Sequence, residues 1–183
     1  MSILKTAKLL YLHLLSKPPG DRMIYRAIRR TSARKIVELG VGTGLRALRM
    51  IEVAGCRVPL GEIQYTGMDL FEARSTADGP GMTLKAAHRL LRVTGAKIQL
   101  VPGDPLASMV RVANLLGKID LLIVSADLEG SCPRAWWFVP RLLHERTEVY
   151  VEEPSADGEP HLRLMPRAEI DRLAAAGAVR RAA

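Results

Sequence analysis

Residues 36–45 of this chain read Ile-Val-Glu-Leu-Gly-Val-Gly-Thr-Gly-Leu, and this stretch decides the fold. A short apolar strand with an acid near its end runs into three alternate glycines and then into a helical segment. Gly40 can adopt the backbone angles of a sharp turn, Gly42 lets a ligand approach the main chain, and Gly44 lets the helix pack on the strand. The unpaired N–H groups at the helix start favour a carboxylate or a phosphate. The stretch therefore predicts a strand-turn-helix unit that holds a nucleotide-like ligand.

The spacing of the glycines narrows the choice of ligand. A dinucleotide-binding pattern, G-x-G-x-x-G, would place glycine at position 45, where this chain has Leu45. The pattern from Glu38 to Gly44 instead resembles motif I of the class I S-adenosylmethionine-dependent methyltransferases. That resemblance implies a Rossmann-like sheet with the cofactor at its carboxyl edge. The alternative is a strand-turn-helix unit with a purely structural role.

Three later segments extend the resemblance, which covers roughly residues 34–177. Residues 63–70 are predicted to form a second strand with an acid, Asp69, at its end. Asp69 lies 25 residues beyond Gly44 (69 − 44). This is near the roughly 20-residue offset expected of an acid that binds the ribose. Residues 97–104 resemble the family's third motif, whose acid usually lies beside the adenine amino group. Residues 118–127 resemble its fourth, a buried strand that delivers polar side chains to the reaction edge. Each acid taken alone could equally be a helix cap.

The resemblance assigns the cofactor, S-adenosyl-L-methionine, to residues at the ends of these strands. Those expected to bind it are Glu38, Gly40, Val41, Gly42, Thr43, Gly44, Asp69, Leu70, Gly103, Asp104 and Ser125. Asp127 is the expected catalytic residue, as a general base or an anchor for the methyl acceptor, and Glu152 and Glu153 follow a neighbouring strand. Asp127 could equally do no more than order the loop before Cys132.

No metal site is expected from the sequence. The four histidines are scattered without an i, i+4 pair, which disfavours zinc. Asp127 with Glu152 and Glu153 could offer oxygen ligands to Mg²⁺ or Ca²⁺. However, Leu128 and Glu129 stand where metal-dependent catechol-type O-methyltransferases carry a lysine. Enzymes that methylate the amino groups of nucleic-acid bases carry an Asn/Asp-Pro-Pro-aromatic motif after the fourth strand, and this chain lacks it there. Base amino groups are therefore disfavoured as methyl acceptors.

Strands and helices are expected to alternate along the chain. This predicts an α/β fold with a mostly parallel sheet and helices on both faces. The resemblance to the methyltransferases implies a three-layer Rossmann-like sheet in the order 3-2-1-4-5. At 183 residues, the chain is expected to form a single domain in which residues 1–33 are a basic, helical N-terminal extension. The predicted helices are 3–15, 21–33, 44–54, 82–94, 105–116 and 133–145, and the strands after the first are 63–69, 97–101, 119–125 and 148–152.

The C-terminus departs from the family pattern. Residues 165–177 resemble the helix that, in these methyltransferases, leads from strand five into an antiparallel hairpin of strands six and seven. Only residues 178–183 follow, enough for one short strand and not for two. We therefore expect the hairpin to be short or missing. Strand five would then lie near an open edge that a partner subunit, in a homodimer, or the preceding loop would cover.

The net charge of +8 is concentrated in the first 35 residues, which hold nine Lys and Arg against one acid, Asp21. The remaining residues hold 18 basic and 18 acidic side chains. Arg22, Arg26, Arg29 and Arg30 follow helical spacing and could attract an anionic partner, including nucleic acid. A solvated helix face explains the same pattern. With only eight aromatic residues, the chain offers few platforms for base stacking.

The function predicted is transfer of a methyl group to a small-molecule or anionic acceptor that the sequence does not identify. The alternatives are a non-catalytic S-adenosylmethionine-binding or interaction module and an RNA methyltransferase. Two cysteines, Cys56 and Cys132, outside any metal or redox spacing favour a reducing, cytoplasmic location. The apolar run 9–15 is too short to span a bilayer, so membrane insertion is not expected.

Overall fold

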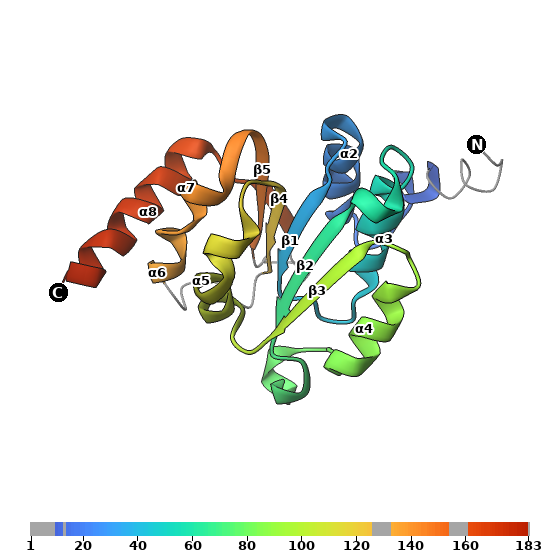
Figure 1. The fold of residues 1–183 in the computed structure, drawn as a ribbon, viewed down its shortest axis with the longest axis horizontal. Helices are drawn as coiled ribbons and strands as arrows, with labels where there is room; N and C mark the ends of the chain where they lie inside the picture. The colour runs from blue at the N-terminus through green and yellow to red at the C-terminus, as the bar shows by residue number, and fades with distance from the viewer. Residues whose placement is uncertain (1–9, 13, 126–132, 154–160, 183) are drawn as a thin grey trace.

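The protein folds around one six-stranded sheet in the order β3-β2-β1-β4-β5-β6 (Figure 1). The computed structural model describes residues 10–12, 14–125, 133–153 and 161–182. The first five strands pair in parallel and β6 pairs antiparallel with β5, so the predicted order 3-2-1-4-5 is confirmed. The strands are β1 (Lys35–Leu39), β2 (Gln64–Asp69), β3 (Lys97–Pro102), β4 (Ile119–Val124), β5 (Leu143–Glu153) and β6 (His161–Leu164).

Helices cover both faces of the sheet. Figure 1 shows α3 and α4 on one side, and α5 to α8 on the other. The helices are α2 (Asp21–Thr31), α3 (Leu45–Ala54), α4 (Leu84–Arg92), α5 (Pro105–Leu116), α6 (Pro133–Trp136), α7 (Val139–Leu142) and α8 (Arg167–Ala182), with 3-10 turns η1 (Leu60–Glu62), η2 (Phe71–Ala73) and η3 (Thr76–Asp78). The predicted three-layer α/β class is therefore confirmed.

Alternation along the strands builds two apolar layers. Ile36 of β1 faces the cluster that contains α2, α3 and α4, whereas the next residue, Val37, faces the cluster that contains α5, α7 and α8. Successive strand side chains point to opposite faces, so a strand buried on both sides is apolar at nearly every position. Glu38 is the exception in β1, being fully buried and charged. An acid in that place needs partners, and these define the site described below.

The predicted helix over residues 133–145 is wrong in its second half. The structure divides this segment into α6, which ends at Trp136, and α7, which begins at Val139, and β5 starts at Leu143. Pro140 explains the break, because proline has no N–H to donate and is tolerated only in the first turn of a helix, where it stands in α7. Leu143 then pairs with Ile119 of β4.

Strand five does not form the open edge that the sequence analysis predicted. Its neighbour is β6, which lies before the last helix and not after it, and Val151 pairs with Arg163 across the two strands. Arg163 also bonds to Glu153 and Glu169, which ties β6 to β5 and α8. The predicted helix 165–177 is present as α8, which continues to Ala182 over residues where one short strand was expected.

The segment before β1 is partly built into the core. Helix α2 confirms the predicted helix 21–33 and completely buries Ile24, Tyr25 and Ile28. Most of the predicted helix 3–15 lies outside the described residues, but residues 10–12 and 14 are helical, with Leu12 buried. No helix in the described part of the chain is long and apolar enough to cross a membrane.

Candidate functional site

A cavity of about 390 Å³ opens where the carboxyl ends of β1, β4 and β5 meet the start of α3. Its volume falls within the range of small-molecule sites, roughly 300–1,000 Å³. Ligands bind at this edge of open α/β sheets because the strand order reverses there, here between β1 and β4. The cavity is lined by Pro18, Asp21, Gly40, Val41, Gly42, Thr43, Leu45, Arg46, Arg49, Arg74, Asp78, Pro80, Ser125 and Glu152.

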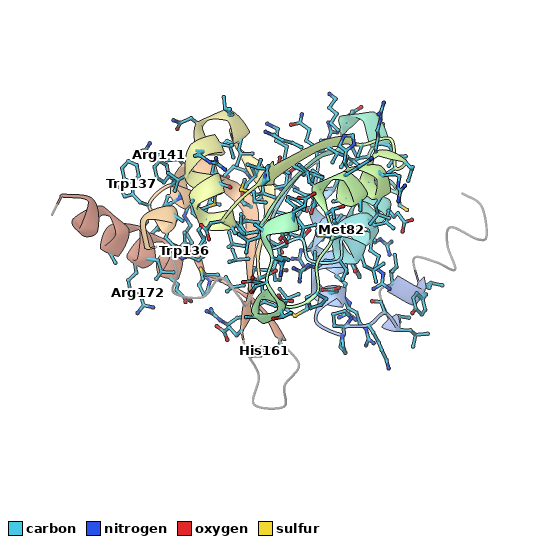
Figure 2. The ribbon with its side chains drawn as sticks, turned by 90° about the horizontal axis from the view of Figure 1, so that it is seen from below. Met82, Trp136, Trp137, Arg141, His161 and Arg172 are labelled. Atoms are coloured by element: carbon cyan, nitrogen blue, oxygen red, sulfur yellow. The ribbon has the colours of Figure 1, made fainter. Side chains whose placement is uncertain are left out.

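The glycine turn forms one wall of this cavity. Gly40, Gly42 and Gly44 all have positive φ, at 87°, 55° and 73°, which side chains other than glycine rarely adopt. Gly42, where the sequence analysis expects a ligand to approach the main chain, lines the cavity. Gly44 serves packing in a different way from the prediction. A Cβ there would lie 3.0 Å from Leu90 of α4 and from Met82, which is labelled in Figure 2.

Arg46, in the first turn of α3, links the strand ends at the cavity floor. Its Nε donates to Glu38 Oε1 at 2.6 Å and its Nη1 to Glu152 Oε1 at 2.7 Å. Its Nη2 donates to Ser125 Oγ at 2.7 Å and, more weakly, to the Gly40 carbonyl at 3.4 Å. This one side chain therefore connects β1, β4, β5 and the glycine turn.

Burial controls the electrostatics of this cluster. Burial raises the pKa of Glu38, and the Arg46 charge together with the hydroxyl donated by Tyr65 offsets this only in part. Burial alone would lower the pKa of Arg46, but Glu38, Glu152 and Asp21 hold it above its ordinary value. The guanidinium is thus permanently charged, and acids surround it.

Asp69, the expected ribose-binding acid, is bonded to the protein itself. Arg74 donates from Nε to Oδ1 at 2.6 Å and from Nη2 to Oδ2 at 2.8 Å. The Gly42 N–H adds a bond at 2.8 Å and the Phe71 N–H one at 3.1 Å. Burial would raise the pKa of Asp69, but these hydrogen bonds outweigh it and lower the pKa. A ribose in the cavity would have to share this carboxylate with Arg74.

The predicted site residues fall into four groups. Gly40 to Thr43 and Ser125 line the cavity, whereas Glu38, Gly44 and Asp69 lie immediately behind its wall. Leu70, Gly103 and Asp104 are not among the lining residues, and Asp104 caps α5 by accepting from Ala107 N at 2.7 Å. Asp127 lies outside the described residues, so its role stays a prediction.

The sequence analysis did not identify Arg46, Arg74 and Asp21 as site residues. The partial positive charge at the start of a helix disfavours a basic side chain in the first turn. The position of Arg46 in the first turn of α3 therefore indicates that acids lie nearby. Asp21 is the one acid among the nine basic residues of the first 35. Both signals are visible in the sequence. Arg74 carries no comparable signal.

Trp136 and Trp137 are not among the residues that line the cavity. Figure 2 shows Trp136, Trp137 and Arg141 grouped at the end of the molecule opposite to Met82. The Arg141 guanidinium lies 3.9 Å from the centroid of the Trp137 ring, and Trp137 contacts Phe138 edge to face. These contacts fix the α6–α7 segment. Within the described residues no cluster of three His, Cys, Asp or Glu side chains could hold a metal ion.

Comparisons with solved structures identify the fold. An O-methyltransferase from Bacillus cereus, in complex with SAH, matches 85% of this chain and 64% of its own, with a TM-score of 0.57 and 16% identity. A putative caffeoyl-CoA O-methyltransferase from Staphylococcus aureus matches 82% of this chain and 66% of its own, at a TM-score of 0.53 and 13% identity. The fold is that of the class I methyltransferases. The O-methyltransferase TomG from Streptomyces achromogenes, in complex with SAM, matches 98% of this chain and 78% of its own, with a TM-score of 0.53 and 14% identity.

This chain spans 64% and 66% of the lengths of the first two of these proteins. No protein-family model matches the chain, and no curated protein sequence matches it. The likeness is therefore one of fold, and the site must be argued from its own residues.

Proposed function

We propose that this chain is an S-adenosylmethionine-dependent methyltransferase acting on a small-molecule acceptor. The observation that carries the proposal is the cavity at the carboxyl edge of the sheet, walled by the glycine turn with its peptide groups bare. The B. cereus and S. achromogenes enzymes with this fold were solved with SAH and SAM respectively, which supports the same cofactor here.

The residues present fit such a ligand in size and chemistry. The peptide groups of Gly40 to Thr43 and the Ser125 hydroxyl would hold its amino-acid end, and a Cβ at Gly42 would fill part of that wall. Asp69 would hold the ribose together with Arg74. The residues predicted to lie beside the adenine of the cofactor remain Leu70, Gly103 and Asp104. When bound, the cofactor supplies a methyl group on a positively charged sulfur, which needs no further activation.

The protein's own task is then placement and the exclusion of water. Orienting an acceptor against an activated group can supply several kcal/mol of the barrier reduction, about 7–11 in favourable cases. Glu152 and Ser125 lie at the strand ends nearest the cavity, held rigidly by Arg46. Asp127, which follows Ser125 by two residues, remains the proposed base or acceptor anchor.

Isothermal titration with S-adenosylhomocysteine tests cofactor binding. We expect the wild-type protein to bind it and Gly42→Val to lose binding, because the added side chain enters the cavity wall. Gly117→Val is the matched control. Gly117 also has a positive φ, 62°, but it follows α5 and is not a lining residue of the cavity, so this variant strains the backbone elsewhere and should bind normally if it folds. Absence of binding to the wild-type protein would contradict the proposal.

Turnover separates an enzyme from a non-catalytic binding module. Transfer of a labelled methyl group from S-adenosylmethionine to a mixture of small alcohols, phenols and amines would identify an enzyme. Binding without transfer to any of them would favour the module, in which the bonds of Arg46 and Arg74 to the site's acids serve structure alone.

RNA methylation is the second candidate, favoured by a basic hollow on α2. Leu10, Leu14, Arg26, Arg29, Arg30 and Arg57 line a space of about 440 Å³. An RNA partner held there would bind with an affinity that falls steeply with salt. The double variant Arg26→Ala with Arg30→Ala should weaken such binding and flatten the salt dependence. Equal RNA affinity of both proteins would remove this candidate.

A further inference from the structure

The cluster around Arg46 contains more acid than base and opens onto the cavity. Three carboxylates, those of Asp21, Glu38 and Glu152, surround the Arg46 guanidinium. Arg49 also lines the cavity, and its Nη1 donates to the Lys17 carbonyl at 2.7 Å. Three carboxyl groups thus face two guanidinium groups, in a place where Asp21 and Glu38 are almost completely buried.

Asp21 has an oxygen that the protein does not satisfy. Its Oδ2 accepts from the Tyr25 hydroxyl at 3.3 Å. Its Oδ1 is, among the described residues, the one buried side-chain oxygen or nitrogen without a hydrogen-bond partner. The nearest cation, Arg46 Nη1, lies 3.8 Å away, beyond hydrogen-bonding distance. Buried acceptors are rarely left unsatisfied, and Asp21 is a lining residue of the cavity although only 2% of its surface is exposed.

Arg46 does not supply the missing bond in this arrangement, because its Nη1 stays 3.8 Å from Asp21 Oδ1 while its three nitrogens are held by other acceptors. Its Nε is bonded to Glu38, its Nη1 to Glu152 and its Nη2 to Ser125. A donor placed in the cavity would complete Asp21, which is one of the lining residues. A group that carries both several N–H donors and a positive charge would satisfy the oxygen and balance the excess acid. An ammonium group has both properties, whereas an anion would meet the carboxylates unfavourably.

We propose that Asp21 and Glu152 form a subsite for the ammonium group of a ligand in this cavity. The inference rests on the proposed function, because the ligand is either the cofactor or the acceptor. The ammonium belongs to the amino-acid end of the cofactor or to a primary-amine acceptor. Both sources share the same chemistry, and the experiment below distinguishes them.

The first arm compares two nucleosides on wild-type protein and Asp21→Asn by isothermal titration. S-adenosylhomocysteine carries the ammonium group and 5′-methylthioadenosine does not. If the cofactor is the source, Asp21→Asn lowers the affinity for S-adenosylhomocysteine at least about tenfold, as expected for the loss of a charge-assisted bond. The affinity for methylthioadenosine stays unchanged. Asp171→Asn, at an exposed position of α8, is the control and should bind both ligands normally.

The second arm tests the acceptor as the source. Wild-type protein saturated with S-adenosylhomocysteine is heated with n-butylammonium or with butan-1-ol, and the melting temperatures are compared. A rise in melting temperature that butylammonium causes and butan-1-ol does not, and that is lost in Asp21→Asn, assigns the subsite to an amine acceptor. Asp21→Asn keeps the shape of the side chain, so a purely structural role would change the melting temperature without changing the selectivity between these ligands.

The inference is overturned if Asp21→Asn binds both nucleosides as the wild-type protein does and responds to butylammonium in the same way. In that case S-adenosylhomocysteine still binds the wild-type protein, and the proposed function stands. Failure of the wild-type protein to bind either nucleoside would reject the proposed function and this subsite together.

Discussion

Arg46 Nη1 lies 2.7 Å from Glu152 Oε1, a bond that joins the first turn of α3 to the end of β5 across 106 residues of sequence. The same guanidinium holds Glu38 of β1 at 2.6 Å. Removing one partner of a buried ion pair leaves uncompensated charge, which typically costs about 3–5 kcal/mol. The architecture of the site therefore depends on this residue.

We predict that Arg46→Met lowers the free energy of unfolding by about 3–5 kcal/mol, measured by urea denaturation. The matched control is Arg167→Met, whose pair with Asp171 is about half exposed on both sides. Such surface pairs contribute less than about 1 kcal/mol. Adding Glu38→Gln to Arg46→Met should recover part of the loss, because the uncompensated charge is removed. Equal stability of the two single variants would contradict the role given to Arg46.

The bond between Asp69 and Arg74 should make the free energy of unfolding depend on pH under acidic conditions. The pKa of Asp69 is lowered from 3.8 in the folded state, so its contribution is present above that value and is lost as the pH falls through the folded pKa. We expect Asp69→Asn to destabilise the protein more at about pH 6 than at about pH 3. Denaturation curves of both proteins at the two pH values provide the measurement. A difference that does not change with pH would show that Asp69 titrates normally.

Gly44→Ala should destabilise the protein by about 1–3 kcal/mol, through the positive φ of 73° and the close approach of Leu90 and Met82. The control is Gly61→Ala, since Gly61 has negative φ and no atom within 4 Å of an added Cβ. That variant should be as stable as the wild type or slightly more so. Thermal unfolding of the pair distinguishes strain at the glycine turn from a general effect of losing glycine.

The position of β6 can be tested with two leucines of that strand. Leu162 is 6% exposed and belongs to the apolar cluster of α2 and α3, whereas Leu164 is 45% exposed. We expect Leu162→Ala to cost about 2–4 kcal/mol and Leu164→Ala less than about 0.5. Similar losses in both variants would mean that β6 does not pack with this register.

The strands could be predicted from the sequence because apolar runs are local features, and the sheet order followed from the resemblance of their ends to the methyltransferase motifs. The errors lie where a local pattern is ambiguous. The predicted helix 133–145 runs past its true end, because Pro140 limits α7 to a single turn and Leu143 pairs with Ile119 as the start of β5. Residues 161–164 are too short to be recognised alone, and Arg163 holds them through Glu153 and Glu169.

The sequence by itself determined the class of fold and the glycine turn, because both depend on residue type and spacing over a few neighbouring positions. Only the tertiary structure decided which charges meet at the site. Asp21, Glu38, Arg46 and Glu152 come from four separate segments, and they converge because the sheet brings its strand ends to one edge. Charge pairing over such distances leaves no periodic trace in the chain, so packing alone selects the partners.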